Sequence, residues 1–191
     1  MALPTSSETE RTVYLRNIVA TAENVIDWPR LTDDDLLLFA RIIHMYSSID
    51  FLLRMTVEIM DEAGMLAPEW KGKTPKLNMY KLNRAIQSAE IWNDGQLFAF
   101  ASIEEHRRVR NLVAHFIARR FPSENAYLFM TKSAADFEQV YGTSAPTGTM
   151  LYGVTDADQL AGIVPILKGL LSWLSKLPKD LSTPMSKHED T

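Results

Sequence analysis

The longest periodic pattern of apolar and polar residues predicts a helix over residues 32–62. Thr32, followed three residues later by Asp35, forms a capping-box pattern at its start, with Asp in place of the usual Glu. Gly64 is typical of a helix end. The apolar face is wide enough to pack against more than one neighbour, a second protomer among them. Its members are Leu38, Ile42, Met45, Ile49, Leu52, Leu53, Ile59 and Met60.

Three further helices are predicted from capping residues and apolar spacing. One covers residues 75–92, with a Pro at its first position. The second covers residues 96–121 and is ended by Pro122. The last covers residues 157–177, and a Pro in its first half is expected to kink it. Residues 11–28 fit a helix and an extended segment equally well.

The pattern changes between the last two helices. The runs NAYLFMTKS (125–133) and TMLYGVT (149–155) are short and rich in aromatic and branched residues, which is typical of strands. AADFEQVYG between them favours a helical turn. The sequence therefore predicts a mostly α fold: an antiparallel bundle of four to five helices with a small β-hairpin-like insertion before the last helix. We expect a flexible N-terminus over residues 1–10, a single domain over residues 11–178 and a flexible tail over residues 179–191.

Composition narrows the function classes. A chain of 191 residues with 46% hydrophobic and 23% charged residues fits one globular domain. The net charge of -4 gives no general reason to expect nucleic-acid binding, so a polyanion site has to come from local clustering. The absence of Cys excludes disulfides and thiolate metal sites. No apolar run reaches the roughly 18–20 residues that span a bilayer, and the polar N-terminus does not resemble a signal peptide. We expect a cytoplasmic protein with no membrane partner.

The segment from His106 to Arg120 stands out because it holds five arginines, two histidines and no carboxylate. On a helix, Asn111 and His115 are four residues apart and share one face. Arg110 is five residues from His115, about 140° away around the axis, and its long side chain can still reach a phosphate held near His115. Arg107 and Arg119 extend the face of Asn111 and His115 into a strip of four.

These residue types suit chemistry on a phosphodiester. Histidine can take or give a proton near neutral pH, and arginine grips a phosphate through two parallel hydrogen bonds. Attack of a ribose 2′-hydroxyl on its own phosphate needs a base, a cation and an acid, and it needs no metal. Two plainer interpretations remain open: a solvated basic helix face, and a histidine with a structural role.

The residues RNLVAH, on a late helix of a small helical bundle, resemble the signature of the HEPN domain family. The resemblance implies a metal-independent endoribonuclease that uses no cofactor and acts as a homodimer, with the two motifs facing each other in a cleft. Many relatives are toxins of toxin–antitoxin pairs, phage-defence components or RNA-processing enzymes. Carried onto this chain, Arg110 would stabilise the scissile phosphate, His115 would be the acid–base group and Asn111 would orient it.

The basic segment itself suggests Arg107, Arg108, Arg119 and Arg120 as contacts to the RNA backbone. The sequence departs from the family at two positions: many relatives have Gly where Phe116 stands, and toxins modified by a nucleotidyltransferase have Tyr where Ile117 stands. Control by such a transferase is therefore not expected, although an antitoxin or regulatory protein remains a possible partner. The alternatives are a non-catalytic HEPN-like module that binds RNA, a nucleotide or a protein, and a helical interaction protein in which the motif is coincidental.

Overall fold

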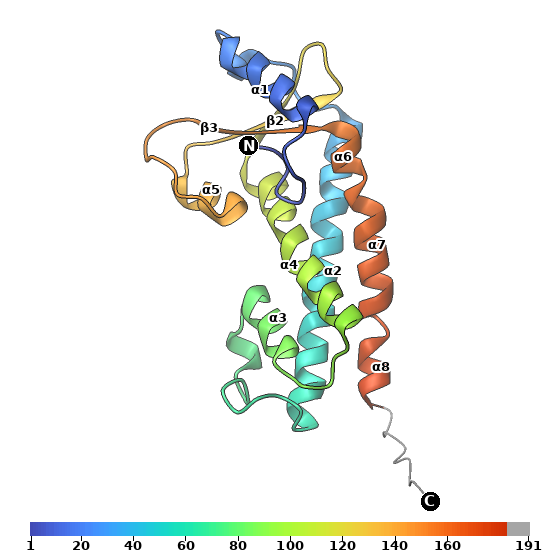
Figure 1. Ribbon diagram of the computed structural model, residues 1–191. Helices are drawn as coiled ribbons and strands as arrows, with labels where there is room; N and C mark the ends of the chain where they lie inside the picture. Colours follow the sequence, from blue (N-terminus) through green and yellow to red (C-terminus); the bar gives the residue numbers. More distant parts are fainter. Residues whose placement is uncertain (183–191) are drawn as a thin grey trace, which may run out of the picture. The chain divides into compact units, whose positions relative to one another are not determined.

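The computed structural model describes residues 1–182, and it confirms a mostly α fold with a small antiparallel sheet (Figure 1). The helices are α1 Glu10–Thr21, α2 Asp33–Glu62, α3 Met79–Gln87, α4 Asp94–His115, α5 Ala134–Tyr141, α6 Ala157–Ala161, α7 Ile163–Leu174 and α8 Leu177–Ser182. Two short 3-10 turns, η1 Val25–Asp27 and η2 Thr74–Lys76, lie between them. The strands are β1 Ile117–Arg120, β2 Ala126–Thr131 and β3 Leu151–Asp156.

The chain divides into two compact units. The first combines Met1–Tyr46 with Ser102–Leu167, and the second combines Ser47–Ala101 with the described part of Lys168–Thr191. The helices α2, α4 and α7 each run from one unit into the other. The sheet and the basic segment of α4 both belong to the first unit, so the candidate site can be described within that unit alone.

Both ends of α2 lie where the sequence places them. The Thr32 hydroxyl accepts a hydrogen bond from the Asp35 amide at 3.3 Å, and the Asp35 carboxylate accepts one from the Thr32 amide at 2.8 Å. This is the reciprocal arrangement of a capping box. At the other end Gly64 has a φ of 70°, and the Met65 amide donates to the Met60 carbonyl at 2.8 Å. A left-handed glycine of this kind satisfies carbonyls at a helix terminus.

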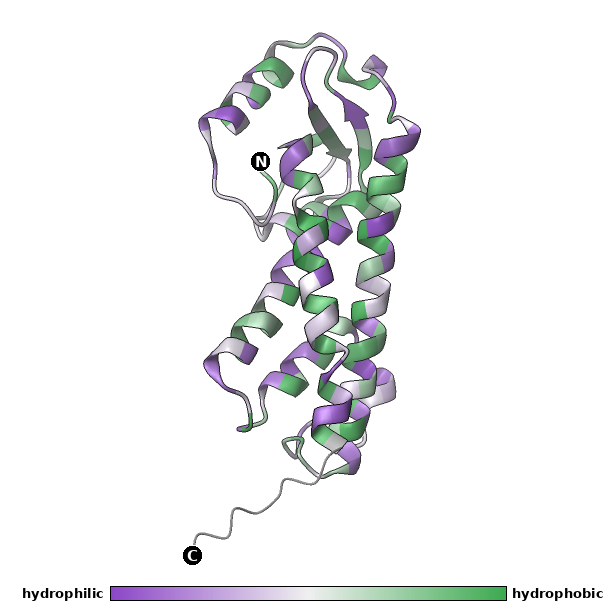
Figure 2. Cartoon of the chain, turned by 90° about the vertical axis from the view of Figure 1, so that its right-hand side faces the viewer, coloured by the Kyte–Doolittle hydropathy of each residue, from purple (hydrophilic) through white to green (hydrophobic). Residues whose placement is uncertain are grey.

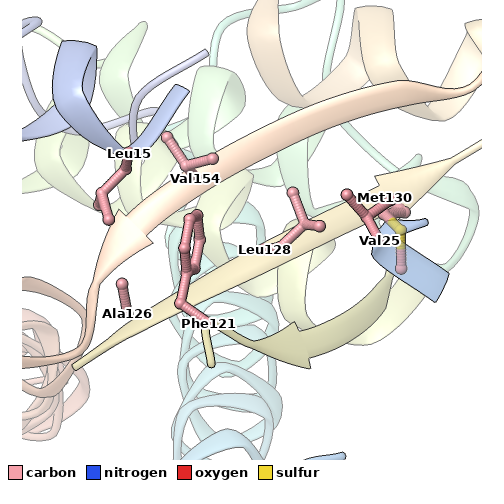
Figure 3. Packing of buried hydrophobic residues seen from close by; sticks show 7 residues of the cluster. All are labelled: Leu15, Val25, Phe121, Ala126, Leu128, Met130 and Val154. Carbon is pink, nitrogen blue, oxygen red and sulfur yellow. The ribbon is translucent and has the colours of Figure 1, made fainter. Parts of the chain in front are cut away.

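The three-stranded sheet is the middle layer of the first unit. Its order is β1-β2-β3 with antiparallel pairs, and every residue of β2 is buried. Alternate β2 residues point to opposite faces. On one face Leu128 belongs to a buried hydrophobic cluster in which Leu15 of α1 lies next to Val154 of β3 (Figure 3). On the other face the rings of Tyr127 and Phe129 lie 5.4 and 5.7 Å from the ring of Phe39 in α2.

The predicted helix over residues 96–121 is wrong at its C-terminal end. α4 stops at His115, and Ile117–Arg120 forms the strand β1, paired with β2 from Ile117↔Met130 to Arg120↔Tyr127. The fully buried β2 offers a ladder of hydrogen bonds that local helix propensity does not anticipate. The insertion is therefore a three-stranded sheet with α5 between β2 and β3, rather than a hairpin.

Other boundaries differ in smaller ways. The ambiguous residues 11–28 form most of α1 and the turn η1. The helix predicted over residues 75–92 is reduced to α3, because the side chain of Asn78 provides the cap. The helix predicted over residues 157–177 is divided into α6, α7 and the start of α8, with Gly162 at the first break. Residues 183–191, within the predicted flexible tail, lie outside the described residues.

The first nine residues, for which the sequence predicts flexibility, make specific contacts. The Met1 carbonyl accepts a hydrogen bond from the Val154 amide at 2.9 Å, so the N-terminal segment lies along the free edge of β3 (Figure 1). The side chain of Leu3 is only 3% exposed. In the second unit the buried amide of Asn83 donates to the Phe100 carbonyl at 2.8 Å, which ties α3 to α4.

Hydrophobic and hydrophilic residues alternate around the long helices (Figure 2). Two helical stretches, Asp33–Glu62 and Ala157–Leu181, are long and apolar enough to cross a membrane by length and composition alone. The core helix of a soluble protein passes the same test, so the finding does not decide between the two settings.

Candidate functional site

The motif residues lie in the last two turns of α4. Asn111 is only 5% exposed, and its side-chain oxygen accepts a hydrogen bond from Nη1 of Arg110 at 3.0 Å. Arg110 is half-buried and His115 is exposed. Within residues 1–182 the imidazole of His115 makes no hydrogen bond. The amide that the resemblance assigns to His115 is thus bonded to Arg110 instead.

The end of α4 is fixed by the residue after the motif. Phe116 is buried, and its ring lies 6.5 Å from the ring of Tyr141 in α5. The main chain beside His115 is therefore anchored, although its side chain faces solvent. By helical geometry Arg110 is about 140° around the axis from His115, whereas Arg108, seven residues before His115, is only about 20° away.

Two of the five arginines are held by carboxylates. Nη2 and Nε of Arg107 donate to Glu104, one turn earlier in α4, at 2.5 and 3.0 Å. Nη2 and Nε of Arg120 donate to the buried carboxylate of Asp35 at 2.5 and 2.9 Å. Each pair cancels one positive charge, so neither arginine contributes a full charge to a phosphate site. Their proposed contacts to RNA remain predictions.

The other three arginines have no carboxylate partner within residues 1–182. Arg110 is bonded to Asn111, and Arg119 donates to the carbonyls of Ile26 and Ala118 at 3.0 and 3.2 Å. Because Arg119 lies in β1, the expectation that it extends the helical strip of α4 is wrong. Arg108 lines a cavity between the N-terminal segment and α5.

Asp35 organises the buried end of the basic segment. Burial alone would raise the pKa of its carboxyl, but hydrogen bonds from Arg120, Tyr127 and Thr32 hold that pKa well below its usual value. The Tyr127 hydroxyl donates to Asp35 at 2.6 Å, and burial together with this bond raises the pKa of Tyr127. The guanidinium of Arg120 also stacks over the Tyr127 ring at 4.8 Å. The cluster ties α2 to β1 and β2.

Sequence reasoning missed two cavities of the first unit. One, of about 210 Å³, is lined by residues of the N-terminal segment together with Arg16, Arg108 and Tyr141. The other, of about 430 Å³, is lined by aromatic residues including Trp28 and by Glu124. No local signal predicts either of them, because their walls come from segments far apart in the chain.

The remaining histidine of the basic segment has a structural environment. His106 is buried, and its Nδ1 lies 2.8 Å from the Ser102 carbonyl, to which it donates. Among residues 1–182, no three or more His, Asp or Glu side chains are grouped closely enough to hold a metal ion. Of the two histidines in the basic segment, His115 is therefore the one whose side chain is exposed.

Comparison of the chain with protein-family models, curated proteins and solved structures finds no match.

Proposed function

We propose that this chain is a metal-independent endoribonuclease of the HEPN type that acts as a homodimer. The proposal rests on two features of the motif. His115 is exposed and has no hydrogen-bond partner in residues 1–182. Arg110, five residues earlier in α4, is held by a buried amide and has no carboxylate partner in residues 1–182. A histidine that served only the fold would be expected to be buried with its hydrogen bonds satisfied, as His106 is.

Each group has a role that its surroundings favour. An imidazole in contact with solvent can exchange protons with a substrate hydroxyl. Arg110 carries a permanent charge that can stabilise the extra negative charge of the phosphorane-like transition state. Asn111 limits the rotamers of Arg110 through its hydrogen bond, so the guanidinium is partly oriented before substrate arrives. Asn111 is therefore a positioning residue for Arg110.

The reaction itself favours a dimer. Attack of the 2′-hydroxyl needs a base for the hydroxyl proton and an acid for the departing 5′-oxygen, and it leaves a 2′,3′-cyclic phosphate. The motif supplies one exposed histidine per chain. Two chains related by a twofold axis bring two such histidines and two Arg110 side chains to one cleft.

The test is cleavage of end-labelled RNA in EDTA by the wild type, Arg110→Ala and His115→Ala. His44→Ala and Arg41→Ala are matched controls, because both residues are exposed and lie on α2 in the first unit. We expect cleavage by the wild type and both controls, with cyclic phosphate ends, and a loss of about a hundredfold or more in each motif variant. The dimer is checked by light scattering on the same samples.

Two results would contradict the proposal. Cleavage that persists in His115→Ala would point to a contaminating nuclease or to another base. RNA binding by the wild type without any cleavage would favour the non-catalytic HEPN-like module, for which the supporting observation is that Asn111 is bonded to Arg110 and not to His115.

A further inference from the structure

The cavity lined by Arg108 is built from three parts of the first unit. The N-terminal segment before α1 forms one wall, Arg16 of α1 and Arg108 of α4 contribute side chains, and Val140 and Tyr141 at the end of α5 close it. Its volume of about 210 Å³ is below the roughly 300–1,000 Å³ of pockets that enclose a drug-sized ligand. The space suits a small ion, or one group of a larger chain.

Its charge is positive. The lining holds two guanidinium groups, of Arg16 and Arg108, against the single carboxylate of Glu8. Arg16 forms an ion pair with Glu8, whereas Arg108 has no carboxylate partner within residues 1–182. Met1 also lines the cavity, and burial, followed by the charge of Arg16, lowers the pKa of its amino group. An anion is the ligand that such a lining favours.

The side chain of Tyr141 forms part of the same wall, but its hydroxyl lies against Gly153 of β3, which is not part of the cavity lining. This hydroxyl is buried and has no hydrogen-bond partner in the described structure. Burial raises the pKa of Tyr141, so this hydroxyl stays protonated at neutral pH. The hydroxyl of Ser6, which also lines the cavity, already donates a hydrogen bond to the Leu3 carbonyl. Within residues 1–182, Arg108 is therefore the side chain of the lining that can donate to an anion without giving up another bond.

We propose that this cavity binds a phosphate group, with Arg108 as its main ligand and Arg16 as a second cation. Arg108 and His115 lie on the same face of α4, about 20° apart around the axis and about 10 Å apart along it. A backbone phosphate of an RNA strand that passes His115 is therefore one source of the phosphate group. Free inorganic phosphate is the other. The site does not depend on ribonuclease activity, and the two proposals fail independently.

The test is isothermal titration of inorganic phosphate into the full-length protein in a chloride buffer. Arg108→Gln removes the main cation, and we expect its dissociation constant to rise about tenfold. Glu8→Gln frees Arg16 from its ion pair, and we expect tighter binding than in the wild type. A misfolded protein would not bind phosphate more tightly, so Glu8→Gln tests the proposal even if Arg108→Gln proves unstable. Arg41→Gln, which removes an exposed charge of the same unit, is the control and is expected to bind like the wild type.

A second arm identifies the source of the phosphate group. A short labelled 2′-O-methyl oligoribonucleotide, which cannot undergo 2′-hydroxyl attack, is bound to wild type and Arg108→Gln with and without inorganic phosphate. Competition by phosphate, together with weaker binding by Arg108→Gln, assigns the site to the RNA backbone. Phosphate binding without competition assigns it to free phosphate.

Two results overturn the inference: no phosphate binding by the wild type, or binding that neither Arg108→Gln nor Glu8→Gln changes. His115→Ala, which removes the proposed acid–base group, is expected to keep its phosphate affinity even if it loses cleavage. Loss of cleavage with intact phosphate binding therefore leaves the cavity proposal standing. Cleavage without phosphate binding rejects the cavity proposal alone.

Discussion

The guanidinium of Arg120, at the end of β1, holds the buried carboxylate of Asp35, in the first turn of α2, through two hydrogen bonds of 2.5 and 2.9 Å. The same carboxylate completes the capping box with Thr32 and accepts the hydroxyl of Tyr127. One side chain therefore fixes the start of the longest helix to two strands of the sheet. This contact also gives a structural role to Arg120, which the sequence predicts as a contact to the RNA backbone.

Asp35→Asn removes the charge and keeps the shape. We expect it to lower the free energy of unfolding at neutral pH by about 2–3 kcal/mol, because the guanidinium of Arg120 loses its counter-charge in a mostly buried site. Urea unfolding followed by circular dichroism measures this loss. Asp34→Asn, an exposed neighbour in the same helical turn, is the control and should cost only a few tenths of a kcal/mol.

The pH dependence of the same pair follows from the lowered pKa of Asp35. A carboxyl whose folded pKa is depressed stabilises the fold above its unfolded pKa of about 3.9 and loses that contribution as the pH falls through the folded pKa. The stability difference between wild type and Asp35→Asn should therefore be constant near neutral pH and shrink below about pH 4. A difference that stayed constant down to about pH 2 would show that the pKa of Asp35 is the same in the folded and the unfolded chain.

Gly153 in β3 is required by the hydroxyl of Tyr141. A Cβ at position 153 would lie 1.9 Å from that oxygen and 3.0 Å from the ring carbon that carries it. Gly153→Ala should therefore destabilise the fold by about 1–3 kcal/mol. Gly169→Ala, in an open position of α7, is the control and should be neutral or stabilising.

Tyr141→Phe relieves the closest contact, so the double variant with Gly153→Ala should lose less stability than the sum of the two single changes. We expect a coupling energy of about 1 kcal/mol in a double-mutant cycle of thermal unfolding. Strict additivity would show that the strand moves away from α5 and that the close approach is not obligatory.

The limits of α2 could be predicted because its signals are local. Thr32 and Asp35 are three residues apart, and Gly64 follows the last turn directly. The strand β1 could not be predicted, because its partner β2 is separated from it by a loop, and its own residues continue an apolar helical pattern from α4. Only the burial of both faces of β2 makes strand pairing the better outcome for residues 117–120.

The candidate site, too, could be predicted from the sequence only in part. Spacing alone places Arg110, Asn111 and His115 in one helical segment, and the structure shows them there. How many of the arginines lack a carboxylate partner could not be predicted from spacing, because such a partner can lie elsewhere in the chain. Asp35 is 85 residues from Arg120, and no sequence signal connects the two. The ion pair between Glu104 and Arg107 could have been predicted from the sequence, because residues three apart on a helix are neighbours.

Glu104→Gln should release Arg107 to bind RNA. We expect tighter binding of a non-cleavable oligoribonucleotide and a plot of log affinity against log salt that is steeper by about 0.7, because one more phosphate is neutralised. Glu105→Gln, the exposed neighbour, removes the same charge without releasing an arginine and serves as the control. Fluorescence anisotropy over a range of salt concentrations measures both. Equal slopes in the two variants would mean that Arg107 does not contact RNA.

Asn111 is predicted to act on cleavage only through Arg110. Asn111→Ala removes the acceptor that holds the guanidinium, so we expect kcat on RNA to fall about tenfold with a smaller change in KM. Asn111→Asp keeps an acceptor but offsets the charge of Arg110, so we expect kcat to fall further than in Asn111→Ala. A purely structural role would not make the variant of matched shape the less active of the two.

Asn83→Ala is the control for the general loss of stability that follows when a buried side-chain amide is removed. Asn83 is also a buried amide, bonded to the Phe100 carbonyl in the second unit. Its loss should lower the melting temperature while leaving kcat unchanged wherever the protein is folded. If Asn111→Ala keeps the wild-type kcat at a temperature where it is folded, the hydrogen bond between Arg110 and Asn111 has no part in catalysis. Arg110 would then have to be oriented by the substrate or by the second protomer.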